Sequence, residues 1–75
     1  MKVGVVGLGL IGGSMAKAVK QKTEHEVIGW DASETIRYSA LLMEALHGFM
    51  VDGTPKDCEI VLRGLYPQLT VDYYK

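Results

Sequence analysis

The chain has 75 residues, of which 48% are hydrophobic and 23% charged, with a formal net charge of −1 at pH 7. This balance excludes intrinsic disorder and a basic nucleic-acid-binding surface, and no apolar run reaches the ~18 residues of a membrane span. A chain of this length forms one small domain, expected over residues 1–75, and hides only about 60–65% of the surface of its unfolded form. Its stability is therefore marginal or shared with a partner.

The N-terminal stretch resembles a secretory signal only superficially. Lys2 precedes an apolar run, but four of the residues from 4 to 12 are glycines, which would break a signal helix. The single cysteine, Cys58, can form no internal disulfide, which points to a reducing compartment or to indifference to redox state. We therefore expect a cytoplasmic protein without a targeting signal.

The first 31 residues have the pattern of a strand, a glycine turn, a helix and a second strand. Residues 2–6 are short, apolar and β-branched, and residues 7–14 read GLGLIGGS. Residues 26–30 form a second apolar run that ends at Asp31, which we expect to cap the next helix. Apolar residues at helical spacing predict a helix between the two strands, with this stripe: Ile11, Met15, Ala18 and Val19.

Residues 33–47 form the longest predicted helix, with Gly48 as its stop signal. One apolar stripe contains Tyr38, Leu41, Leu42, Ala45, Leu46 and Phe49, and a second set contains Ile36, Ala40, Met43 and Met50. This helix is apolar around most of its circumference, and a small monomer has too little protein to cover it. We therefore expect self-association, most simply as a homodimer, with or without exchanged elements.

The last third of the chain predicts a third helix and a third strand. Thr54 is a candidate cap before Pro55. Residues 69–74 alternate between apolar and polar, as in a strand with one face in the core. The expected fold is α/β, with a small three-stranded, mainly parallel sheet and a Rossmann-like first βαβ unit. The stripe of the third helix is Cys58, Val61, Leu62 and Leu65.

The spacing Gly7-x-Gly9-x-x-Gly12 is typical of a dinucleotide-binding turn when a strand precedes it and a helix follows it, as predicted here. Gly7 permits a tight turn, Gly9 lets the backbone approach a pyrophosphate, and Gly12 lets the helix lie close to the strand. Free N–H groups at the helix start attract phosphates. Asp31 would accept hydrogen bonds from the adenosine ribose and favour NAD over NADP. Whether the motif still binds NAD, or only turns the chain, is left open by the sequence, and any affinity is expected to be weak.

Residues 1–40, which include MKVGVVGLGLIGGSMAKAVK and HEVIGWD, resemble the N-terminal segment of prephenate dehydrogenases, NAD-linked enzymes of tyrosine synthesis. The resemblance implies no catalytic residue here, because the family's catalytic histidine and prephenate-binding arginines belong to later segments. His25 and His47 are expected to be surface residues. The resemblance implies these cofactor-binding residues: Gly7, Gly9, Leu10, Ile11, Gly12 and Asp31.

Residues 51–72, VDGTPKDCEIVLRGLYPQLTVD, resemble a segment of a different family, the metal-dependent survival-protein nucleotidases. That family's metal-binding acidic pair has no counterpart in this sequence, so no metal site is expected. Cys58 lies on an apolar stripe and is expected to be a core residue rather than a nucleophile. Two partial resemblances, each without catalytic residues, indicate an engineered or shuffled chimera without a complete enzymatic function. The alternative is a truncated NAD-binding module of a prephenate dehydrogenase-like oxidoreductase.

Overall fold

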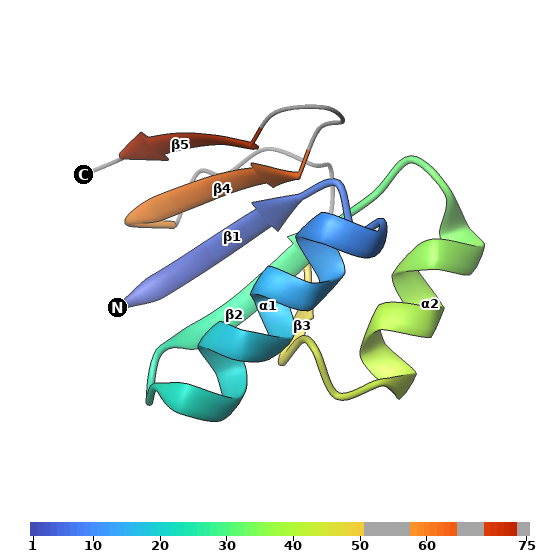
Figure 1. Cartoon of the computed structure of the whole chain (residues 1–75), viewed down its shortest axis with the longest axis horizontal. Helices are drawn as coiled ribbons and strands as arrows, with labels where there is room; N and C mark the ends of the chain where they lie inside the picture. Colours follow the sequence, from blue (N-terminus) through green and yellow to red (C-terminus); the bar gives the residue numbers. More distant parts are fainter. Residues whose placement is uncertain (51–57, 65–68, 74–75) are drawn as a thin grey trace.

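The structure, a computed structural model, describes residues 1–50, 58–64 and 69–73. These residues form two helices on one side of a five-stranded sheet (Figure 1). The elements in chain order are β1 (Lys2–Val6), α1 (Leu10–Lys22), β2 (Glu26–Trp30), α2 (Glu34–Leu42), β3 (Gly48–Phe49), β4 (Ile60–Gly64) and β5 (Leu69–Tyr73).

The strand order in the sheet is β3-β2-β1-β4-β5. The first four strands are parallel, and β5 is antiparallel to β4. The predicted α/β class and the first βαβ unit are confirmed, but the predicted number of three strands is wrong. Two strands were missed, the two-residue β3 at one edge and β4 beside β1.

The predicted third helix is wrong over the part that the structure describes. Residues 60–64 are β4, which pairs in parallel with β1, with Val5 opposite Leu62. Val61 and Leu62 are adjacent in sequence, point to opposite faces of the sheet and are both buried. A strand buried on both faces is continuously apolar, so a helical stripe can be read into it. The expected cap at Thr54 and Pro55 lies outside the described residues.

The helix predicted over residues 33–47 ends early, at Leu42, and Gly48 belongs to β3 instead of stopping a helix. Glu44 adopts a left-handed conformation with φ of 59°, and the Ala45 amide donates to the Ala40 carbonyl at 3.0 Å. This turn directs Ala45 and Leu46 into the core, where they are almost completely buried. The free energy gained by burying these two apolar side chains therefore outweighs that of continuing the helix.

The helices face the sheet through small side chains. Ala16 of α1 and Ala40 of α2 are buried in the same cluster as Val3, Val5 and Val27 of the sheet. The predicted helical stripes are confirmed only in part: Met15 and Val19 pack against this cluster and Ala45 and Leu46 belong to it, but Ala18 and four larger apolar residues expected in the core are exposed. The four larger residues are Ile11, Tyr38, Leu41 and Leu42.

The predicted C-terminal strand is confirmed over residues 69–73, but its predicted inward face is wrong. Val71 and Tyr73 are exposed, because β5 is an edge strand and neither described helix reaches it. On the sheet face away from the helices, Cys58 and Met50 are buried next to Gly4. The expectation that Cys58 is a core residue agrees with this burial.

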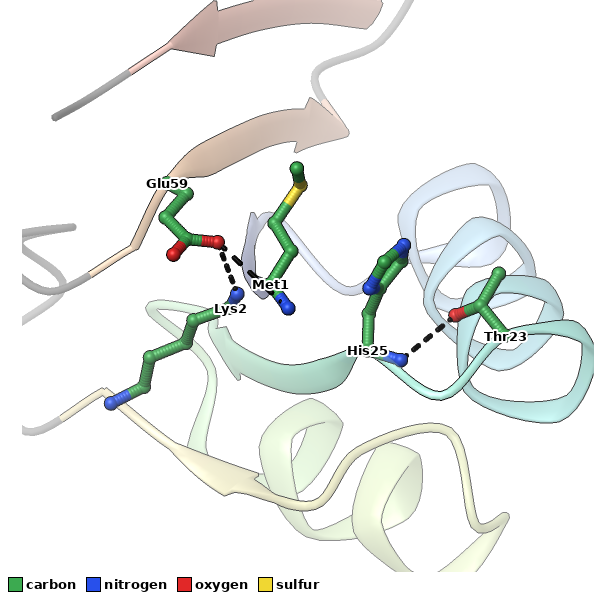
Figure 2. Close-up of polar contacts among 5 residues, drawn as sticks. All are labelled: Met1, Lys2, Thr23, His25 and Glu59. Carbon is green, nitrogen blue, oxygen red and sulfur yellow. Dashed lines mark hydrogen bonds and ion pairs between the residues drawn. The ribbon is translucent and has the colours of Figure 1, made fainter.

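Glu59 fastens the first residues of β1 to the start of β4 (Figure 2). Its backbone amide donates to the Lys2 carbonyl, and its side-chain Oε2 accepts from the Lys2 amide at 2.9 Å. The Met1 ammonium group lies 3.9 Å from the same oxygen. These contacts extend the β1–β4 pairing by one residue at the amino ends of the two strands, opposite to the glycine turn.

Within the described residues, neither helix is long and apolar enough to cross a membrane.

Candidate functional site

The glycine turn connects the carboxyl end of β1 to α1. Gly7 has φ of +90°, a conformation that residues with a side chain rarely adopt, and its amide donates to the Trp30 carbonyl at 2.8 Å. The tight turn expected at Gly7 is therefore present. It is tied to the end of β2 as well as to β1.

Gly12 lies in the first turn of α1, against this loop. A Cβ atom at Gly12 would overlap the carbonyl oxygen of Gly7, and it would also come within 3.4 Å of the Gly64 Cα. The close approach predicted for Gly12 is therefore present, and it brings the helix start against the ends of two strands, β1 and β4.

Gly9 differs from these glycines because a Cβ atom there would meet nothing within 4 Å. It is the N-cap of α1, has no capping side chain, and is followed by a first turn without acidic residues. The first amides of a helix have no partner within the helix, and they carry the positive end of its dipole. Open space therefore adjoins the end of α1 that attracts anions.

The two other predicted residues of the loop, Leu10 and Ile11, begin α1. The Ile11 side chain is exposed. The side chain of Leu10 lies outside the described part of the structure. The structure thus places the backbone of both residues at the helix start and leaves their contact with a ligand as a prediction.

Asp31 follows β2 and lies beside the glycine loop. Its Oδ2 accepts from the Leu8 amide and its Oδ1 from the Ser33 amide, both at 2.8 Å. The prediction that Asp31 caps the next helix is wrong, because Ser33 is the N-cap and accepts from the Ile36 amide. Asp31 instead fixes the loop against the end of β2. A carboxylate has about four acceptor positions, so two remain for other donors, such as ribose hydroxyls.

The loop lies at the point where the chain changes direction across the sheet. From β1 the order runs through β2 to β3 on one side, and through β4 to β5 on the other. In open parallel sheets, ligands bind outside the carboxyl ends of the strands at this switch point. Strands β2 and β4 lie on the two sides of β1, so the structure contains such a switch point at the end of β1.

Two residues at the carboxyl end of β4 were not predicted from the sequence to belong to this site, Arg63 and Gly64. Arg63 is opposite Val6 at the carboxyl end of β1. A Cβ atom at Gly64 would lie 2.5 Å from the Gly7 oxygen and 2.7 Å from the Gly12 Cα. The apolar run 60–62 is a signal for the buried strand that carries these two residues, but the contact of Gly64 with Gly7 and Gly12 has no signal in the local sequence.

A pocket of about 390 Å³ lies between α1 and α2, and one end of it reaches the glycine loop at Leu8 and Gly9. This volume is in the range of small-molecule sites. Its other lining residues are Gly13, Ser14, Lys17, Ile36, Ser39, Ala40, Met43 and Ala45.

The two histidines lie away from this edge. His47 is exposed, and its Nδ1 accepts from the Val27 amide at 2.9 Å, which helps to attach the β3 segment to β2. His25 is partly buried, and its backbone amide donates to Thr23 Oγ1 (Figure 2). Within the described ranges, no three His, Cys, Asp or Glu side chains lie close enough to hold a metal ion.

Compared with known proteins, the chain matches no family model and no curated relative.

Proposed function

We propose that this chain binds an adenine dinucleotide of the NAD class at the carboxyl edge of β1, β2 and β4. The position of the glycine loop at the switch between β1 and β4 carries the proposal. The open space at Gly9 supports it, because the backbone there is accessible to a ligand. The resemblance of residues 1–40 to prephenate dehydrogenases points in the same direction.

The chain's own residues would hold the dinucleotide with backbone and carboxylate groups. The amides at residues 9–12 would bind the pyrophosphate, and the free acceptor positions of Asp31 would bind the adenosine ribose. The nicotinamide of a bound dinucleotide supplies hydride transfer. The proposal assigns no catalytic residue, and the absence of a complete enzymatic function stays a prediction. A chimeric origin and a cytoplasmic location are also predictions, and the binding proposal depends on neither.

Calorimetric titration with NAD⁺ and NADH tests the proposal. We expect saturable binding with a Kd of about 1 mM or tighter, and a loss of affinity of at least about tenfold in Gly9→Ala, because the new methyl group would occupy the space of the pyrophosphate. The Gly9→Ala protein should fold normally, since its Cβ meets no atom within 4 Å.

Gly48→Ala is the matched control. A Cβ atom at Gly48 also meets nothing within 4 Å, but this residue lies in β3 and away from the loop. We expect it to bind NAD as the unmodified chain does. Equal affinity of all three proteins, or no heat of binding with folded protein, would contradict the proposal.

A further inference from the structure

The surface of α2 carries an unusual amount of exposed apolar side chain for a helix of nine residues. Leu42 is 83% exposed and Met43, its C-cap, is 60% exposed. Apolar side chains gathered on one small element in this way are typical of a contact surface. The other exposed members are Ile36, Tyr38 and Leu41.

The groove between α1 and α2 lies next to this surface. It is the pocket described above, and α2 contributes one of its walls through Ile36, Ala40 and Met43. A protruding apolar surface and an apolar groove therefore share residues on the same helix.

The charges around the groove complement each other. Lys17 lines the groove on the α1 side, and α1 contains no acidic residue. Glu44 directly follows Leu42 and Met43, and is exposed in its left-handed turn. An element that inserts Leu42 and Met43 into a groove of this kind would bring Glu44 near Lys17.

We propose that a second copy of this chain occupies the groove. The segment Leu42-Met43-Glu44 of each copy enters the α1–α2 groove of the other, with Glu44 of one copy facing Lys17 of the other. Such a twofold arrangement uses the same patch on both copies, as a self-complementary interface requires. A small apolar ligand could fill the groove, but it would leave Leu42 in water, so the second copy accounts for more of the exposed surface. The inference does not rest on dinucleotide binding, although one end of the groove reaches the glycine loop at Leu8 and Gly9.

Sedimentation equilibrium between micromolar and submillimolar concentration tests the inference. We expect the unmodified chain to form dimers, and Leu42→Lys to weaken the dimer at least about tenfold, because it places a cation near Lys17 of the other copy. Leu42 is so exposed that the fold should tolerate the change, and a lysine suits the end of a helix. Unchanged circular dichroism and thermal unfolding at low concentration would show that the variant is folded.

A charge exchange tests the geometry, and an edge-strand variant supplies the control. Lys17→Glu should weaken the dimer, and adding Glu44→Lys should restore it, because the pair is reversed rather than lost. Tyr73→Lys, on the exposed face of β5, should leave association unchanged. A folded monomer at all concentrations would overturn the proposal, as would no effect of Leu42→Lys, failure of the exchange to restore the dimer, or dissociation caused by Tyr73→Lys.

Discussion

Replacing Gly12 by alanine is expected to lower the free energy of unfolding by about 3 kcal/mol or more, the upper end of overpacking costs. The added Cβ would overlap the carbonyl oxygen of Gly7, whose peptide group is held by the hydrogen bond from the Leu8 amide to Asp31. The intrinsic helix preference favours alanine over glycine by only about 1 kcal/mol, so the clash dominates. Because small domains are stable by only about 5–15 kcal/mol, the change removes a large part of the total.

Urea denaturation followed by circular dichroism measures this effect, with Gly48→Ala as the control. The control adds the same methyl group where nothing lies within 4 Å, so its midpoint should equal or slightly exceed that of the unmodified chain. An equal urea midpoint for Gly12→Ala and the control would contradict the close contact between α1 and the loop after β1.

Gly64→Ala is expected to cost about 2–3 kcal/mol, although Gly64 is far from the loop in sequence. Its Cβ would lie 2.5 Å from the Gly7 oxygen and 2.7 Å from the Gly12 Cα, both of which are backbone atoms. The cost depends on β4 lying beside β1, and the helix predicted from the sequence would not produce it. The same urea measurement therefore tests the sheet order.

The double variant Gly12→Ala/Gly64→Ala gives an internal check. Both substitutions push α1 away from the same three-glycine contact, so their combined cost should be smaller than the sum of the two single costs. Full additivity would mean that the two glycines act at separate places and would contradict the contact between them.

The β1–α1–β2 unit could be predicted from the sequence because its signals are local. Residues 2–6 and 26–30 are apolar runs of strand length, and the glycines between the first strand and α1 have the spacing of a strand-to-helix turn. The structure confirms these elements, together with the roles of Gly7 and Gly12 in the turn.

The later elements could not be predicted in the same way because tertiary contacts decide them. Val61 and Leu62 fit a helical stripe with Cys58, but together with Ile60 they also fit a buried strand. Only the pairing with β1 makes residues 60–62 a strand. Ala45 and Leu46 continue the apolar pattern of α2, yet their burial against the sheet requires the helix to end before them.

The candidate site could be predicted only in part, because some of its residues are identified by local spacing and others only by tertiary contacts. The loop residues and Asp31 were identified from their spacing, and the structure brings them together. Gly64 was missed because its role depends on its distance from Gly7 and Gly12, which no local pattern encodes. Asp31 was wrongly predicted to be the N-cap of α2. Ser33 is an equally suitable residue type for this position and directly precedes the helix.

The most direct test of dinucleotide binding is the set of backbone amide NMR signals that shift when NAD⁺ is added to the ¹⁵N-labelled chain. We expect the shifting signals to come from residues 7–13 and 31–33, and from Arg63 and Gly64 at the end of β4. Saturation is expected at millimolar NAD⁺ or below. No shift at that concentration, or shifts confined to the α1–α2 groove around Lys17, Ser39 and Met43, would contradict the account.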